Sequence, residues 1–444
     1  MKQVIIILLI CAEAVFAQNI KENIFGFDTP NAFTYCDVND TSFINKAVRM
    51  NPKVLRFPGG AEGNFYHFGK NGYGFDFDEI DKYHGGTFPK RSRGLENSRR
   101  KKNQNYDYID DFIVLVKKTN ASVVLSANPF VDNDDIILMI EKLHANNIKV
   151  IGVELGSELS NRSYFNKGYT IDDYILFAKS CSDKIKAKFP KIETAIVAAP
   201  LGEKIGHRHN VWNNRLAAVN FYDAIIIHSY AKVTKGEDQY GQMLSEETEG
   251  KNKSEAFDIY KNRAISFFDE YYPNEVRNYV KIFKKPIWVT EWNLQMSETT
   301  GNTLLQSLFA AQYLLELMSN PKLSAIELTT YHNLGGRTIS GSIFRNNEEK
   351  MEIQSTYYPM MMIGKIFKNK IVKIEQQKSK DIFSYKCYDK YNKEVLSYKI
   401  DWGSRQLSCT YNTVGSIKKS MVYKSENLFD KADNLGILDL EFRE

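Results

Sequence analysis

The chain has 444 residues and a formal net charge of +5 at pH 7, with 43% hydrophobic and 25% charged residues. This length is enough for one large domain and a small companion domain. The net charge is too modest to indicate a nucleic-acid partner, and none is expected. Beyond the N-terminus no segment approaches about 20 uninterrupted apolar residues, so we expect no membrane span.

The first residues have the pattern of a secretory signal. Lys2 precedes an apolar run from residue 4 to residue 11, and small residues stand where cleavage after Ala17 requires them. We expect residues 1–17 to be a signal peptide and the protein to be secreted or periplasmic. A lipoprotein signal at Cys11 ranks second, because Ile10 is larger than that signal normally allows.

From residue 18 to residue 365, apolar β-branched runs alternate with helical stretches, which is typical of repeated βα units. The eight runs are residues 23–27, 54–57, 122–127, 151–155, 194–198, 224–228, 286–290 and 325–330. Amphipathic helices are expected at residues 108–118, 134–145, 171–188 and 303–318, with a long loop plus helix at residues 232–280. The pattern predicts a (β/α)8 TIM barrel, whose active site forms at the C-terminal ends of the strands.

From about residue 368 the chain changes to short alternating strands separated by turn residues. They cover residues 371–374, 382–386, 395–400, 408–411, 421–423 and 436–440. This pattern predicts an antiparallel β-sandwich domain over residues 366–444. No flexible linker separates the two regions, so we expect the domains to pack together.

Four cysteines would remain after signal cleavage: Cys36, Cys181, Cys387 and Cys409. In an exported protein they can pair, and Cys387 with Cys409 is the expected couple because they lie in neighbouring strand-like segments. Four cysteines are too few for a disulfide scaffold, and their spacing does not match a zinc site.

Two of the predicted strands end on a carboxylate. Residues 151–158 end at Glu158 and residues 286–292 contain Glu291, so both carboxylates should face the mouth of the barrel. Two carboxylates in one pocket provide what cleavage of a glycosidic bond requires, an acid for the leaving oxygen and an anion for the oxocarbenium-like carbon.

Four short motifs at these strand ends carry a family resemblance: residues 55–60 (LRFPGG), 154–158 (ELGSE), 228–230 (HSY) and 289–293 (VTEWN). In this order they resemble the retaining glycoside hydrolases of clan A. The nearest branch has a barrel plus a β-sandwich and includes α-L-arabinofuranosidases, β-xylosidases, heparanase-like β-glucuronidases and some agarases. The resemblance implies a glycosidase with Glu158 as acid/base and Glu291 as nucleophile. Together with the signal pattern, it leads us to expect a secreted enzyme that needs no cofactor and degrades a polysaccharide or oligosaccharide.

The nucleophile must stay ionised, and Arg56 and Tyr230 are the expected donors around it. The acid should be buried among apolar groups so that it keeps its proton. Clan members usually carry Asn just before the acid/base, where this chain has Ser157, a shorter side chain with one donor. The full set of expected substrate-binding residues is Arg56, Asn128, Ser157, His228, Tyr230, Trp292 and His332.

A basic cluster follows the second strand, between Lys90 and Lys102. It contains Lys90, Arg91, Arg93, Arg99, Arg100, Lys101 and Lys102, opposed only by Glu96. We interpret it as a solvated loop or, alternatively, as a basic rim beside the active site that attracts an anionic polymer.

Two other function classes stay open at this stage. A carbohydrate-binding barrel without activity would explain Ser157 but leaves the two glutamates without a role. A metal-dependent hydrolase would use His207, His209 and His228, although a His-x-His pair without a partnering carboxylate motif is usually a loop. The motifs do not choose among arabinosyl, xylosyl, glucuronosyl and galactosyl substrates.

Overall fold

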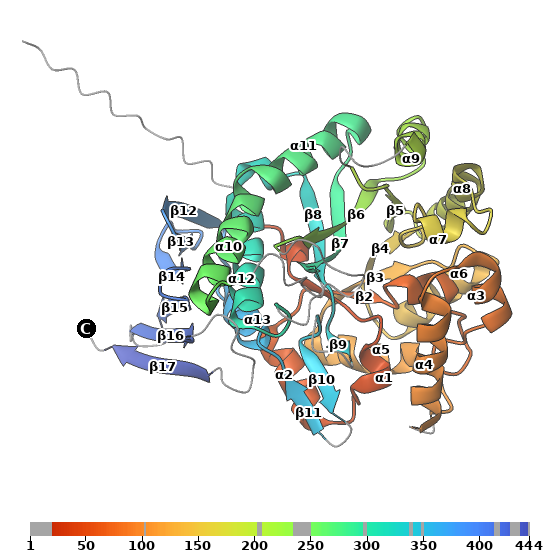
Figure 1. Cartoon of the computed structure of the whole chain (residues 1–444). Coiled ribbons are helices and arrows are strands. Elements are labelled where there is room, and N and C mark those ends of the chain that lie inside the picture. The colour runs from red at the N-terminus through yellow and green to blue at the C-terminus, as the bar shows by residue number, and fades with distance from the viewer. Residues whose placement is uncertain are drawn as a thin grey trace, which may run out of the picture.

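The structure is a computed structural model of the chain (Figure 1). It describes residues 20–101, 104–201, 207–233, 250–295, 300–336, 341–347, 350–412, 418–426 and 436–442. The expected signal peptide, residues 1–17, lies outside the described residues. In the part of the chain that is described, no helix is long and apolar enough to span a bilayer.

Eight parallel strands close into a barrel in sequence order, as the βα pattern predicts. They are β1 (Gly26–Asp28), β2 (Val54–Phe57), β3 (Ser122–Ser126), β4 (Val150–Glu154), β5 (Glu193–Val197), β6 (Ala224–Ala231), β7 (Ile287–Leu294) and β8 (Ile326–Tyr331). The strands are buried almost throughout, because helices cover the outside of the barrel and side chains fill its inside. The predicted TIM barrel is confirmed.

Helices surround the barrel (Figure 1). They are α1 (Ala32–Tyr35), α2 (Thr41–Met50), α3 (Phe77–Tyr83), α4 (Phe88–Lys101), α5 (Tyr108–Thr119), α6 (Asp134–Ala145), α7 (Arg162–Phe165), α8 (Ile171–Lys188), α9 (His207–Ala217), α10 (Lys253–Ser266), α11 (Tyr272–Phe283), α12 (Leu304–Ser319), α13 (Tyr357–Ile363) and α14 (Lys365–Lys368). Shorter turns are η1 (Glu22–Ile24), η2 (Ala61–Phe65), η4 (Phe267–Tyr271) and η5 (Pro321–Leu323). Side-chain caps begin several helices: Asp107 caps α5, and capping boxes start α8 at Thr170 and α10 at Asn252.

Two further sheets follow the barrel strands. A small sheet combines β9 (Gly335–Gly336), β10 (Phe344–Asn347) and β11 (Lys350–Ile353). The C-terminal domain is an antiparallel meander of β12 (Lys373–Ser379), β13 (Ile382–Tyr388), β14 (Glu394–Asp401), β15 (Gln406–Asn412), β16 (Lys418–Lys424) and β17 (Gly436–Phe442). The predicted antiparallel domain after the barrel is confirmed, and in the described residues its six strands form one sheet.

The C-terminal sheet packs on the barrel through α12, which lies between them (Figure 1). All sixteen residues of α12 are buried, because one side faces the barrel and the other faces the sheet. Trp402 donates a hydrogen bond to Gln312 of α12 at 2.6 Å, and Tyr385 donates one to Glu316 at 3.1 Å. The two domains therefore share a continuous core, as expected.

The expected disulfide between Cys387 and Cys409 is wrong. Both cysteines are buried and free, as are Cys36 and Cys181. Cys387 lies on β13 opposite Leu396 of β14, whereas Cys409 lies on β15, on the far side of β14. A whole strand separates the two thiols, and neighbouring strands lie about 4.8 Å apart.

Candidate active site

The two strand-end carboxylates meet at the mouth of the barrel. Glu158 follows β4 after a turn in which Gly156 and Glu158 both have positive φ, 83° and 50°. Glu291 lies in β7, whose register to β6 slips by one residue so that His228 pairs with Glu291. One oxygen of each carboxylate and a ring nitrogen of His228 all lie within 4.8 Å of one another.

Glu291 is surrounded by donors. Its Oε1 accepts from Arg56 Nη1 at 3.0 Å, and its Oε2 accepts from the Tyr230 hydroxyl at 2.6 Å. The Nδ1 atoms of His228 and His332 lie 3.5 and 3.8 Å from Oε2. The side chain is only 7% exposed, so these contacts act in a site with little water.

This environment keeps Glu291 ionised. Burial alone would raise its pKa, but the charges of His228, His332 and Arg56 and the Tyr230 hydrogen bond lower the pKa far below the ordinary value. A carboxylate that stays anionic is suited to act as a nucleophile, and it carries no proton that it could donate as an acid. Arg56 and Tyr230 thus lie where the sequence predicted.

His228 connects the two glutamates. Its Nδ1 is 2.9 Å from Glu158 Oε1, and its Nε2 is 3.3 Å from the hydroxyl of Thr290. Burial would lower the pKa of His228, but the charge of Glu291 and the hydrogen bond with Glu158 raise it to about 9. The imidazole is therefore protonated at neutral pH and bridges both carboxylates as a cation.

Glu158 occupies a more open position than Glu291. Its side chain is 45% exposed, and its Oε2 accepts from Asn161 Nδ2 at 2.8 Å. The expectation that the acid is buried among apolar groups is therefore wrong. A group that must exchange a proton with a leaving oxygen and later with water requires such access.

A buried ion network holds the floor of the site. Arg56 has no exposed surface and binds Asp28 at 2.9 Å and Glu154 at 2.6 Å in addition to Glu291. Glu154 also accepts from Thr290 at 2.6 Å, so this residue within β4 joins the network to β7. Asp28, which the motifs did not single out, lies at the C-terminal end of β1, one residue beyond the expected strand.

Ser157 faces the same network. Its hydroxyl accepts from Arg56 Nη2 at 3.2 Å, which leaves its own proton free to donate into the site. Its backbone is fixed by Asn64, whose amide accepts from Ser157 N at 2.7 Å and donates to Ser157 O at 2.6 Å. Asn64 was not expected, because its loop after β2 approaches β4 only in the folded barrel.

His332 lies at the end of β8, in line with the prediction for a site residue. Its Nδ1 is 2.9 Å from Asp28 Oδ2. Burial would lower the pKa of His332, but the charges of Glu291 and Asp28 and the hydrogen bond to Asp28 raise it. His332 therefore holds a proton more tightly than an ordinary imidazole and places a second ring beside Glu291.

Two predicted substrate contacts lie elsewhere. Trp292 has no exposed surface and stacks on Tyr313 of α12, with ring centroids 4.1 Å apart, so the expected sugar contact is wrong. Successive side chains of a strand point to opposite faces, and Glu291 takes the inward one. Asn128 is buried after β3, where it donates to Tyr66 O at 3.1 Å and accepts from Phe130 N at 2.9 Å, so it supports its own loop.

Among the described side chains, the histidines do not assemble as the metal-hydrolase interpretation expects. His209 lies beside Arg208, at 2.9 Å, and the side chain of His207 is outside the described residues. Two groups have ligand-type atoms close together: Glu158 with His228 and Glu291, and Asp28 with Glu291 and His332. Arg56 and the protonated His228 already supply positive charge there, so the donor set does not suit a cation.

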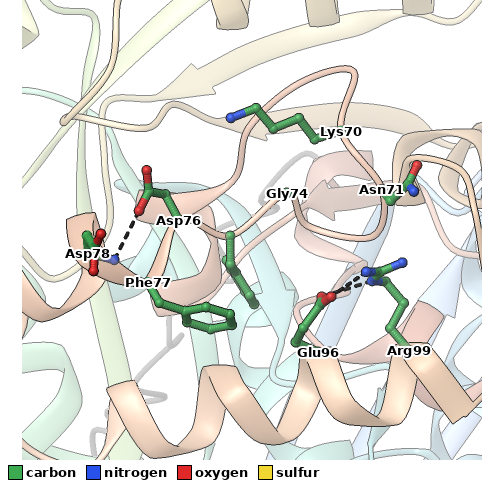
Figure 2. A pocket seen from close by; sticks show the side chains of 9 residues that line it. Lys70, Asn71, Gly74, Asp76, Phe77, Asp78, Glu96 and Arg99 are labelled. Carbon is green, nitrogen blue, oxygen red and sulfur yellow. Dashed lines mark hydrogen bonds and ion pairs between the residues drawn. The ribbon is translucent and has the colours of Figure 1, made fainter.

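As far as the structure describes it, the basic cluster lies in a helix, α4, rather than a loop, and three of its arginines are paired with carboxylates; Lys102 lies outside the described residues. Arg93 pairs with Asp81 at 2.7 Å, and Arg91 pairs with Glu62 at 3.1 Å. Figure 2 shows Arg99 held by Glu96 on the wall of a surface hollow of about 530 Å³ that contains neither site glutamate. A narrower cavity of about 50 Å³ lies beside Glu158 and His228.

Comparisons with known proteins identify the fold. No protein-family model matches the chain, and no curated protein does. Among solved structures, the family 51 α-L-arabinofuranosidase AbfB from Bifidobacterium longum is similar with a TM-score of 0.64 at 10% identity, covering 97% of this chain and 93% of that one. The GH51 arabinofuranosidase from Xanthomonas axonopodis pv. citri gives a TM-score of 0.61 at 10% identity, with coverage of 96% and 94%.

The GH51 α-L-arabinofuranosidase from Thermotoga petrophila is similar over 96% of this chain and 94% of that one, with a TM-score of 0.54 at 16% identity. At these identities the likeness establishes a shared architecture: a barrel followed by an antiparallel β domain, as in the branch that the motifs resemble.

Proposed function

We propose that this protein is a retaining glycoside hydrolase with Glu158 as acid/base and Glu291 as nucleophile. The observation that carries the proposal is the placement of the two carboxylates, whose nearest oxygens lie within 4.8 Å of each other. Retaining enzymes separate the carboxyl groups by about 5–5.5 Å, whereas inverting enzymes separate them by about 6.5–9.5 Å to admit a water. The structural neighbours are named as glycosidases, which supports the same reaction class.

In the first step, Glu291 attacks the anomeric carbon while Glu158 gives its proton to the glycosidic oxygen. The bond from carbon to the leaving oxygen breaks, and a glycosyl ester forms on Glu291. Negative charge thereby passes from Glu291 to Glu158. His228 contacts both carboxylates and can stabilise the charge before and after the transfer.

In the second step, Glu158 takes a proton from water, and the resulting hydroxide equivalent attacks the anomeric carbon from the side the leaving group vacated. The ester breaks and Glu291 returns to the anionic form, which Arg56 and Tyr230 stabilise through their hydrogen bonds. The exposed position of Glu158 gives this water access. Two inversions yield net retention.

The substrate of the proposed reaction is a polysaccharide or oligosaccharide, and the site of action is outside the cytoplasm, as the signal pattern of residues 1–17 indicates. Ser157 takes the position from which a sugar hydroxyl next to the anomeric carbon would be bound. The alternative of an inactive carbohydrate-binding barrel is less well supported, since it gives no role to the two carboxylates that meet at the mouth of the barrel.

Hydrolysis and its stereochemistry test the proposal together. The purified protein should cleave at least one member of a panel of aryl arabinosides, xylosides, glucosides, galactosides and glucuronides. Proton NMR of the first product should show the anomeric configuration of the substrate. Inversion would contradict the proposed geometry, and a protein that binds saccharides but cleaves none of them would favour the inactive barrel.

A further inference from the structure

A carboxyl group outside the buried ion network lines the narrow cavity beside the proposed acid/base. The walls of this cavity include Glu158 and His228 of the site together with Glu275 and Tyr279 of α11. Its volume of about 50 Å³ is enough for a water molecule but too small for a sugar. The cavity therefore joins Glu158 to Glu275 through a space of the size of solvent.

Glu275 reaches this cavity because α11 packs on the ends of β5 and β6. The hydroxyl of Tyr279 donates a hydrogen bond to Ala199 O at 3.1 Å, which fixes the helix against the end of β5. Residues four apart lie on the same face of a helix, so Glu275 and Tyr279 point to the same side of α11. The opposite walls come from the ends of β5 and β6.

The carboxyl group of Glu275 has no partner of its own in the part of the chain that the structure describes. It takes part in no hydrogen bond or salt bridge there, and burial raises its pKa to about 7. Glu275 therefore changes between its neutral and anionic forms close to neutral pH. The proposed chemistry so far makes no use of this group.

The other ionisable groups near α11 are engaged elsewhere. On α11 itself and on the elements packed against it, they are Arg277 and Lys281 of α11, Asp269, Glu270 and Tyr271 of η4, Arg208, His209 and Arg215 of α9, Lys322 of η5, and Tyr313 of α12. The arginines of α9 bind Ser160 O and Asp172, and Asp269 binds Lys378. The remaining charged groups line a separate hollow on another face of α11, and burial keeps His209 and the tyrosines neutral.

The acid in the proposed mechanism has to hold a proton before it meets a substrate. Glu158 is 45% exposed and lies 2.9 Å from the cationic His228, so apolar burial does not hold that proton. A neighbouring carboxyl group can do so instead. Two carboxylates that face one small cavity repel each other when both are ionised, which favours the state in which one of them keeps a proton.

We propose that Glu275 is a positioning residue that shares a proton with Glu158 through water in this cavity and so keeps the acid/base protonated. The inference deepens the proposed glycosidase function and rests on it. When Glu158 is anionic, a proton passes from the Glu275 carboxyl to a cavity water, and that water gives one of its own protons to Glu158. Glu275 becomes the anion, the water is unchanged, and solvent returns a proton to Glu275.

The chain offers a matched control for Glu275. Glu275→Gln replaces the carboxyl by an amide of the same shape, and Glu270→Gln makes the same change at an exposed position outside the cavity. Glu275→Asp keeps a carboxyl group at the cavity and should behave as wild type. Glu275→Gln should melt no lower than wild type at pH 8, because it removes a partly buried charge that has no partner.

The pH dependence of kcat/KM tests the role of Glu275. Its basic limb reports loss of the acid's proton from the free enzyme. For a glycoside with a poor leaving group, Glu275→Gln should move this limb down by about half a pH unit or more and leave the acidic limb in place. Activated aryl glycosides should keep their rate, since they need little protonation, and Glu270→Gln should follow wild type. An unmoved basic limb, or equal losses on both substrate types, overturns the inference and leaves the glycosidase proposal intact.

Titration of the two carboxyl groups gives a readout that does not need activity. In protein labelled with ¹³C at the glutamate carboxyls, the NMR signals of Glu158 and Glu275 are assigned from their Gln variants. The titration midpoint of each group should fall by about half a pH unit or more when the other is replaced by Gln. Coupled midpoints in a protein that cleaves no glycoside would support the shared proton, and only the proposed function would fail. Independent midpoints would overturn the inference.

Discussion

Arg56 connects every charged residue at the floor of the proposed site. It has no exposed surface and contacts Asp28, Glu154 and Glu291, three buried carboxyl groups that would lose their shared cation without it. His228, whose pKa is raised to about 9, and His332, whose pKa is also raised, lie next to Glu291 and Asp28. Burial raises the pKa of Asp28 and of Glu154, and Arg56 and the histidines oppose that shift, which explains how these ionisable groups are tolerated together in a barrel core.

The proposed acid/base role of Glu158 predicts an effect that depends on the leaving group. Glu158→Ala should slow cleavage of natural saccharides by roughly 10²–10⁴-fold, the usual contribution of general acid catalysis. Aryl glycosides with activated leaving groups should keep much of their first-step rate, since they need little protonation. The measurement is burst and steady-state kinetics on both substrate types. Equal losses on both would show that Glu158 is not the acid.

The cation at His228 predicts a shift in the pH profile. The pKa of Glu291 lies below its ordinary value partly because of His228, so the proposed nucleophile is ionised well into acid. In His228→Asn the pKa of Glu291 should rise, and the acidic limb of kcat/KM for an aryl glycoside should move up by about one pH unit or more. His144→Asn, at an exposed position of α6, is the control. An unmoved limb would contradict the assigned electrostatics.

The shifted pKa values of His228 and Glu291 define the pH range in which these groups stabilise the folded protein. The raised pKa of His228, about 9, contributes stability that is complete below its ordinary value of 6.5 and is lost as pH rises through about 9. The lowered pKa of Glu291 contributes stability that is present above its ordinary value of 4.5 and is lost as pH falls through the folded-state value. The charged network is therefore intact between these limits.

At the scale of elements, the turn after β2 packs closely against Asp28 of the buried ion network. Gly59 has φ of +78°, and a Cβ there would overlap Asp28 Oδ1. Gly69 also has φ of +78° but has nothing within 4 Å of such a Cβ. Substitution of each glycine by alanine therefore separates two energetic costs. Both variants place a side chain at a positive φ, but only Gly59→Ala also brings a Cβ against Asp28.

Gly69→Ala should lower the free energy of unfolding by about 1 kcal/mol, the usual cost of a left-handed conformation for a residue with a side chain, and should keep activity. Gly59→Ala should lose more stability and most activity, because Asp28 must move away from Arg56 and His332. Urea unfolding and kcat/KM measure the two effects. Equal behaviour of the two variants would contradict the close packing of Gly59 on Asp28.

The sequence predicted those site residues that strand ends supply. Glu158, Glu291, Arg56, Tyr230 and His332 lie within or directly after apolar runs, and a barrel brings such ends together whatever the details of its loops. Asn64 and Asn161 could not be found in this way, because they come from turns whose approach to the site depends on the tertiary fold. Trp292 was misassigned although strand alternation already placed it opposite Glu291.

At the scale of the whole molecule, the barrel and the C-terminal sheet form one packed body around α12. The domain order was predictable from the change in periodicity near residue 368, because alternating strands and βα units bury their apolar residues differently. The order of neighbouring strands in the C-terminal sheet was not predictable in this way. The expected disulfide between Cys387 and Cys409 was wrong because β14 lies between the strands that carry them.

This shared core predicts a single unfolding transition. Circular dichroism, tryptophan fluorescence and residual activity should be lost together on heating, because separation of the sheet would expose α12. Trp402→Phe removes the hydrogen bond to Gln312 and should lower the stability of the whole chain by about 1–3 kcal/mol without splitting the transition. Two resolved transitions would show that the domains unfold independently.

The role of Glu291 is the central claim, and chemical rescue tests it most directly. Glu291→Ala should lose turnover because no glycosyl ester can form, and azide should restore part of the rate on an activated aryl glycoside. Azide attacks from the face that the carboxylate vacated, so the product should be a glycosyl azide of inverted anomeric configuration, identified by NMR. A Glu291→Ala variant that retains wild-type turnover, or that azide rescues with retained configuration, would contradict the account.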